Sequence, residues 1–197
     1  VFERPVCISE DGRYFSAFDG KIHEDNGEPF YTDDWIWDTY RAAHPLRLLI
    51  DEGTDKNVID SYLRMAEQMG DMWMPTFPEI TGDSRRMNSN HAVATVADAA
   101  AKGLQFDLEK AYEACRKGIE EKTLAPWSGA AAGWIDDFYK KNGYIPALQA
   151  GEKETDPNVH PFEKRQPIAF TLGTSYALSC LSRIADMLAK YDAAARN

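Results

Sequence analysis

Hydrophobic residues recur at helical spacing along most of the chain. In residues 56–69 the apolar positions follow the i, i+3, i+4, i+7 pattern of one buried helix face: Val58, Ile59, Tyr62, Leu63, Ala66 and Met69. Helical patterns with a capping residue or a glycine at one end predict helices over residues 32–50, 88–102, 108–122 and 134–143. A final long helix is predicted over roughly residues 168–195. The chain is therefore predicted to be all-α.

The first part of the chain lacks this helical pattern and is rich in glycine, aspartate and aromatic residues. RYFSAF alternates as a short strand, and FDGKIH is typical of a turn and a return strand, so the two predict a β-hairpin. Thr32 is a good N-cap, and Asp33 and Asp34 would complement the dipole of a helix that runs to about Ile50 through a kink at Pro45. We therefore divide the chain into a strand and loop lead-in over residues 1–31 and a helical part over residues 32–197.

The predicted helices are of uneven length and are paired through short loops. No short repeat of the tetratricopeptide or armadillo kind is present. Uneven helix pairs are typical of an α/α toroid, and this chain would supply about three pairs. The expected fold is a partial toroid with a short β-hairpin near its N-terminus.

Composition and charge exclude some classes of partner. The formal net charge is -10, which argues against a nucleic-acid partner because binding phosphates requires a basic face. No apolar run approaches the roughly 18 residues of a membrane span. The three cysteines, Cys7, Cys115 and Cys180, lack the spacing of a zinc site, and the last two lie in helical patterns that predict buried thiols.

The stretch FYTDDWIWDTYR carries the densest candidate chemistry. In a helix that begins at Asp33, residues 34, 38 and 41 would share one face, so Asp34, Asp38 and Arg41 are predicted to form a stripe beside Trp37. Three interpretations stay open at this point. The stripe is an exposed ion pair of little energetic value, a sugar site of rings and carboxylates, or a DDxxxD magnesium site of an isoprenoid-type enzyme.

One histidine joins this group of candidates. His91 lies at the start of the alanine-rich segment SNHAVATVADAAAK. A histidine in this position is either a buried or capping residue or part of a site. No Ser-His-Asp arrangement, glycine-rich phosphate loop or HExxH motif is present, so the sequence contains no known catalytic motif of these kinds.

Successive blocks of the chain resemble the α-mannosidases of glycoside hydrolase family ninety-two. The blocks are YFSAFDGKIH, FYTDDWIWDTYRAAHPL, MNSNHAVATVADAAAKGLQFDLEKAYEA, NGYIPA and FEKRQPIAFTLGTSY, and they occur in order from about residue 10 to about residue 176. The resemblance implies an (α/α)6 toroid catalytic domain. It also implies an exported enzyme, in the periplasm, at the cell surface or secreted, that removes α-linked mannose from glycans with inversion and with calcium.

The resemblance assigns binding residues to this chain but no catalytic acid or base. By position, Trp37 and Asp38 match residues that hold the terminal mannose, and Asp34, Arg41 and His91 fall in the same motif blocks. The family's acid, base and calcium-site motifs would lie beyond Asn197. The chemistry agrees, because an inverting glycosidase needs two carboxyl groups about 6.5–9.5 Å apart on opposite sides of the sugar. Asp34 and Asp38, one helical turn apart, would lie on the same side.

The resulting expectation is a part of an exo-α-mannosidase of the α-1,2 type, with a mannose-containing glycan and the remainder of the catalytic domain as partners. The alternatives are a non-catalytic helical module or fragment, and the magnesium-dependent isoprenoid-type enzyme built on DDWIWD.

Overall fold

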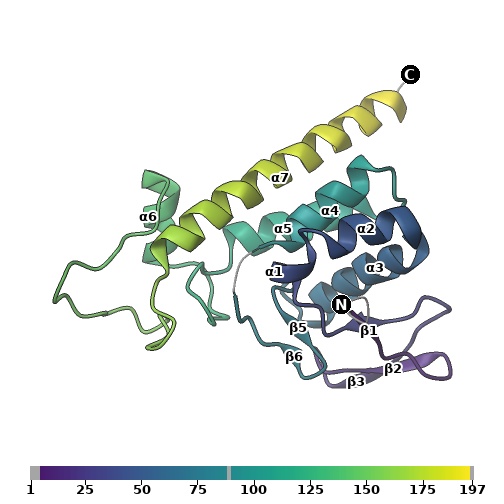
Figure 1. Cartoon of the computed structure of the whole chain (residues 1–197), viewed down its shortest axis with the longest axis horizontal. Coiled ribbons are helices and arrows are strands. Elements are labelled where there is room, and N and C mark those ends of the chain that lie inside the picture. The colour runs from purple at the N-terminus through teal and green to yellow at the C-terminus, as the bar shows by residue number, and fades with distance from the viewer. Residues whose placement is uncertain (1–4, 88–89, 196–197) are drawn as a thin grey trace.

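The computed structural model describes residues 5–87 and 90–195, and these form a mainly helical fold with small strand pairs (Figure 1). The helices are α1 (Ile36–Thr39), α2 (Ala43–Ile50), α3 (Glu52–Gln68), α4 (Ala92–Ala101), α5 (Leu108–Glu120), α6 (Trp134–Asn142) and α7 (Pro167–Ala195). The strands are β1 (Val6–Cys7), β2 (Arg13–Ser16), β3 (Lys21–Glu24), β4 (Tyr31–Thr32), β5 (Pro78–Glu79) and β6 (Gly82–Asp83). The predicted all-α class is confirmed in its mainly helical content, strand pairs beyond the predicted hairpin are added to it, and the toroid arrangement stays a prediction.

The predicted hairpin is β2 paired antiparallel with β3, with Arg13 opposite Glu24 and Ser16 opposite Lys21. Side chains of β2 alternate between the two faces of the hairpin: Tyr14 and Ser16 are buried, whereas Phe15 between them is exposed. The Tyr14 ring stacks on Phe30 with centroids 4.1 Å apart, which fixes the hairpin against the core. The chain on either side of the hairpin forms a second antiparallel pair, β1 with β4.

The main core lies where α4 and α5 pack against α7 and α3. Almost every side chain of α4 is buried, and most of them are alanine or valine. These small side chains let the long helix α7 approach α4 closely, and α7 runs alongside α5 and α4 in Figure 1. Cys115 on α5 and Cys180 on α7 are buried free thiols in this core, as predicted.

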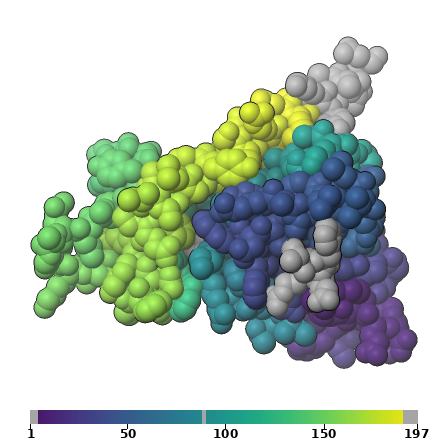
Figure 2. Space-filling view, in the orientation of Figure 1, coloured from purple at the N-terminus to yellow at the C-terminus, as the bar shows by residue number. Residues whose placement is uncertain are grey.

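A smaller core joins α6 to the start of α7 at the other end of the molecule. It is formed by Leu124, Ala125, Ile135, Tyr139, Ile145, Val159 and Phe170. The long loop between α6 and α7 is closed by Arg165, whose guanidinium donates to both carboxylate oxygens of Glu154 at 2.6 and 2.8 Å. This part forms a projection away from the main core (Figure 2).

The prediction of one continuous helix from Thr32 to about Ile50 is wrong. Thr32 ends β4, and Asp33 has a φ of 53°, in the left-handed region, which a right-handed helix cannot include. The segment instead forms the single turn α1 and then the separate helix α2. Pro45 is the third residue of α2, within the first turn, where a missing backbone N–H breaks no helical hydrogen bond, so the predicted kink is absent.

Candidate functional site

Helix α1 is one turn long and depends on tertiary contacts. Trp35 occupies its N-cap position, and no side chain there accepts a hydrogen bond from the first turn. Asp33 Oδ1 instead accepts from the backbone N–H of Ile80 at 3.1 Å, and the Trp35 ring stacks on Phe77 with centroids 5.7 Å apart. A single turn has little stability of its own, so neighbouring elements determine where α1 lies.

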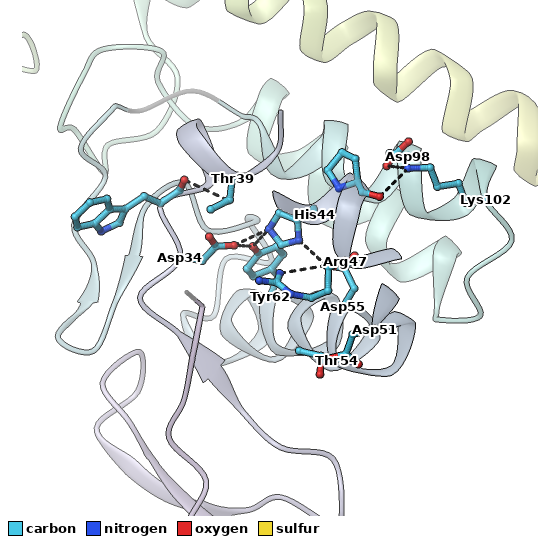
Figure 3. Close-up of polar contacts among 12 residues, drawn as sticks. Asp34, Thr39, His44, Arg47, Asp51, Thr54, Asp55, Tyr62, Asp98 and Lys102 are labelled. Carbon is cyan, nitrogen blue, oxygen red and sulfur yellow. Dashed lines mark hydrogen bonds and ion pairs between the residues drawn. The ribbon is translucent and has the colours of Figure 1, made fainter. Parts of the chain in front are cut away.

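A buried network of charged and polar side chains joins Asp34, just before α1, to α2 and α3 (Figure 3). His44 on α2 contacts two carboxylates: its Nε2 lies 2.7 Å from Asp34 Oδ2, and its Nδ1 lies 2.7 Å from Asp55 Oδ1. The hydroxyl of Tyr62 donates a hydrogen bond to the same oxygen of Asp34. Arg47 Nη1 lies 3.4 Å from Asp55 Oδ1 and adds a second positive charge. All five residues are at least nine-tenths buried.

The network keeps Asp34 and His44 charged despite their burial. Burial by itself would lower the pKa of His44, but the charge of Asp34 and the hydrogen bonds with both carboxylates raise it to about 9. Burial by itself would raise the pKa of Asp34, yet the charge and hydrogen bond of His44 and the Tyr62 hydroxyl bring it below its usual value. His44 is therefore an imidazolium that donates both ring N–H groups. Two carboxylates face two cations, so the network is neutral as a whole.

Above this network, the residues that follow Trp35 form a cluster of aromatic rings. His91 stacks on Tyr40 with centroids 4.3 Å apart and planes at 9°, and Trp37 lies 4.9 Å from the same imidazole. The guanidinium of Arg41 lies 5.1 Å from the Trp37 ring centroid and 5.2 Å from that of Tyr40, at cation–π distance. Asp38, next to Trp37, is exposed. We call Trp37, Tyr40, Arg41 and His91 the aromatic cluster.

The imidazole of His91 is neutral. It is 3% exposed, and both of its nitrogens lack a hydrogen-bond partner among the residues that the structure describes. Burial lowers the pKa of His91 to about 4, and the charge of Arg41 acts in the same direction. His91 therefore supports the rings of Trp37 and Tyr40 as a flat, uncharged group.

The structure brings some predicted residues together and separates others. Trp37, Arg41 and His91 meet in the aromatic cluster, with Asp38 exposed beside them. The predicted stripe of Asp34, Asp38 and Arg41 is wrong, because Asp34 precedes the helix and its side chain turns inward to His44. Asp34 is completely buried, so in the described chain its carboxylate faces His44 and Tyr62 rather than the surface.

Sequence reasoning missed the partners of Asp34. Asp55 and Tyr62 are seven residues apart on α3, which places both on its buried face. An aspartate on an otherwise apolar helix face requires a buried partner, and this was the available signal. His44, ten residues from Asp34, has no periodic relation to it, and only folding brings the two together.

The described residues do not bring together three His, Cys, Asp or Glu side chains that could hold a metal ion. The aspartates of DDWIWD point to different neighbours, since Asp33 accepts from Ile80, Asp34 faces His44 and Asp38 is exposed. The magnesium interpretation of this motif is therefore not supported. Within the described residues, no helix is long and apolar enough to cross a membrane.

The half-buried rings of Trp37 and Tyr40 thus lie near the exposed side chains of Asp38 and Arg41, an arrangement suited to a polar ligand with apolar faces. Comparison with known families makes this specific. The chain belongs to glycoside hydrolase family 92: the sequence model described as "Glycosyl hydrolase family 92 catalytic domain" matches residues 1–196. The predicted family is therefore confirmed, and the chain is part of a glycoside hydrolase catalytic domain. Comparison with curated proteins gives no significant match.

Solved structures of this family share the fold. The inverting mannosidase BT2199 from Bacteroides thetaiotaomicron is 30% identical, with a TM-score of 0.74 over 100% of this chain and 24% of its own. The α-mannosidase BT3965 from the same organism, in complex with mannoimidazole, is 24% identical, with a TM-score of 0.75 over 96% of this chain and 22% of its own. The present chain thus spans less than a quarter of the length of these relatives.

Proposed function

We propose that the complete protein is a calcium-dependent, inverting exo-α-mannosidase of the α-1,2 type, and that this chain supplies residues that bind the terminal mannose. The observation that carries the proposal is the aromatic cluster with the exposed carboxylate of Asp38 beside it. Family membership and the mannosidases among its structural relatives support the substrate class.

The side chains have complementary roles toward a pyranose. The ring of Trp37 packs against the C–H face of the sugar, and the two oxygens of Asp38 accept hydrogen bonds from adjacent hydroxyl groups. The guanidinium of Arg41 lies at cation–π distance from two rings, and its Nε–H donates to the backbone carbonyl of Trp37 at 3.4 Å, which restricts its orientation. The Nη groups are the ones that would donate to the sugar at the edge of the site. The buried ring of His91 packs against Trp37 and Tyr40 and fixes their positions.

The catalytic acid and base are proposed to come from the remainder of the catalytic domain. An inverting mechanism requires one protonated carboxyl group and one carboxylate that activates water. Asp34 can serve as neither, because it is buried and bound to His44 and Tyr62. Asp38 alone cannot supply both groups. In this proposal the chain binds the sugar, and bond cleavage depends on partner segments.

Calcium and export are proposed on the same family grounds. The described residues do not by themselves fit a calcium ion, since they lack a group of three suitable ligands. The ligands would therefore come from other parts of the complete enzyme, and no step is assigned to the ion here. An exported enzyme would meet mannose-containing glycans outside the cytoplasm.

The test is release of free mannose from an α-1,2-linked mannobiose by the complete enzyme. We expect release in calcium and loss of release in a chelator. Asp38→Ala should lower kcat/KM by about a hundredfold or more, because one carboxylate that binds two hydroxyls is lost. Circular dichroism should show an unchanged fold, since Asp38 is exposed.

Asp137→Ala is the matched control. Asp137 is also an exposed aspartate in the first turn of a helix, on α6. We expect its kinetics to match those of the wild type. Near-normal kinetics of Asp38→Ala would show that the binding site is assigned to the wrong surface, and full activity in the chelator would remove calcium from the proposal.

A further inference from the structure

Helix α1 carries Trp37 and Asp38 but has few means of holding its own position. It is a single turn without a side-chain N-cap. On one side, Asp33 and Trp35 connect it to the β5–β6 segment through Ile80 and Phe77. On the other side, Asp34 connects it to α2 and α3 through His44 and Tyr62.

His44 is the centre of this second connection. Its two nitrogens lie at the same distance, 2.7 Å, from Asp34 on the α1 side and from Asp55 on α3. The imidazole therefore bridges two elements that are not covalently adjacent. A buried charge–charge bridge of this kind is directional, because each N–H must point at one oxygen, whereas apolar packing would permit sliding.

We propose that His44 is a positioning residue of the sugar-binding surface: it fixes Asp34, and through Asp34 the turn that presents Trp37 and Asp38 to the sugar. This inference rests on the proposed function of that surface. His44 itself is buried and does not contact the substrate.

The surroundings of His44 explain why a histidine occupies this position. The charged neighbours are Asp34 before α1, Asp55 on α3 and Arg47 on α2 itself, and Tyr62 on α3 adds a hydroxyl. A neutral side chain would leave two buried carboxylates facing one arginine, an uncompensated charge that is costly in the interior. A protonated imidazole is a planar cation with two opposed N–H donors, so it donates to one oxygen of each carboxylate at once.

Helix α4 also packs against α2 and carries charges. Lys102 on the C-terminal side of α4 pairs with Asp98 at 2.7 Å and donates to the backbone carbonyl of Pro45 at 3.4 Å (Figure 3). Both members of this pair are about one-third exposed, so solvent screens them. The protonation of His44 is therefore governed by Asp34 and Asp55.

The experiment compares His44→Gln with the wild type in the complete enzyme, with kcat and KM for an α-mannoside measured from pH 6 to 10. Glutamine retains one donor but cannot bridge two carboxylates. We expect kcat/KM of His44→Gln to fall about tenfold or more, since small displacements of binding groups have large effects on rate. We also expect the wild type to lose kcat/KM as pH rises through about 9, where His44 loses its proton, and the variant to lack this limb.

The matched control is His23→Gln. His23 also pairs with an aspartate, Asp19, at 3.0 Å, but in the β2–β3 hairpin and with its side chain 30% exposed. We expect its kinetics and pH profile to match the wild type. A purely structural effect of His44→Gln would reduce the yield of folded enzyme without changing the alkaline limb of the profile.

Tyr62→Phe is a second variant that tests the positioning role if His44→Gln does not fold. This change removes one hydrogen bond to Asp34 and keeps the ring packing. We expect a smaller loss of kcat/KM in the same direction. Unchanged kinetics in a folded His44→Gln, or in Tyr62→Phe where the first variant is unfolded, would overturn the positioning role.

These outcomes separate the inference from the proposed function. A wild-type enzyme that cleaves the mannoside and depends on Asp38, but not on His44, overturns the positioning role alone. A wild-type enzyme without activity on α-mannosides, or with no dependence on Asp38, overturns both.

Discussion

At the scale of single residues, burial decides what each of two aspartates in the same motif can do. Asp34 and Asp38 belong to one motif, four residues apart, and either could have been the binding carboxylate. Asp38 is exposed beside Trp37, whereas Asp34 is completely buried and bound to His44 and Tyr62. The same functional group thus serves architecture at Asp34, whereas at Asp38 it is accessible for the sugar-binding role that we propose.

The buried imidazolium makes stability depend on pH. The pKa of His44 is raised in the folded protein from 6.5 to about 9, so the folded state binds a proton more tightly than the unfolded state does. Its contribution to stability is therefore complete below about pH 6.5 and is lost as the pH rises through about 9.

We predict that the difference in melting temperature between wild type and His44→Gln is largest near pH 6 and narrows as the pH rises to 10. The reason is that the wild type loses the contribution of the imidazolium, which the variant never has. Thermal unfolding followed by circular dichroism at several pH values measures this difference. A difference that stays constant across this range would mean that His44 does not change its proton in the window.

Among the elements, helices with local end signals are those whose bounds were predicted well. Asp107 caps α5, and its Oδ1 accepts from the backbone N–H of Lys110 at 2.9 Å. Gly143 ends α6 with a φ of 77°, and its N–H donates to Tyr139 at 2.7 Å. Both signals act within a few residues, so they can be recognised without the rest of the fold.

Asp107→Ala is predicted to destabilise the protein by about 1 kcal/mol, because the backbone N–H of Lys110 loses its acceptor. Urea unfolding of the variant measures the loss. Asp107→Asn is the control, because asparagine also caps helices well and should stay within about 0.5 kcal/mol of the wild type. Equal losses in the two variants would indicate that the charge, and not the hydrogen bond, stabilises this end of α5.

For the molecule as a whole, one face of α7 stands out. Ile168, Leu172 and Tyr176 follow one another at spacings of four residues and are 77%, 67% and 48% exposed. The Tyr176 ring lies 6.1 Å from Tyr40, so this apolar row leads to the aromatic cluster. Such a continuous row is unusual on a monomer surface and indicates a face that packs against other protein. The remainder of the catalytic domain is the partner we propose for it.

We predict that this chain, expressed by itself, self-associates through that face. Light scattering coupled to size-exclusion chromatography should show species larger than the 22.2 kDa monomer. A double change of Ile168→Ser and Leu172→Ser should shift the chain toward monomer, whereas Arg183→Lys on the same helix should not. A monodisperse wild-type monomer would count against both the apolar face and the half-toroid arrangement, which itself stays a prediction.

Much of the fold could be read from periodicity. The helices over residues 52–68, 108–120 and 167–195 and the hairpin correspond to predicted segments, because each has a repeating apolar face or a strand alternation. The aromatic and acidic composition of FYTDDWIWDTYR indicated the segment whose Trp37 and Arg41 meet in the aromatic cluster, and the sugar-binding role of this segment stays a prediction. These features depend on residues a few positions apart.

The form of the site depended on contacts distant in sequence. Asp33 adopts a left-handed conformation and is bonded to Ile80, and Asp34 is drawn inward by His44 and Tyr62. Together these contacts stop the helix that local propensity favoured at Thr32 and turn one aspartate away from the surface. A prediction from helical spacing is valid only where the segment is a helix. Here the buried charges of Asp34, His44 and Asp55 pair with one another, and this pairing outweighs the local helical propensity because a buried charge without a partner is costly.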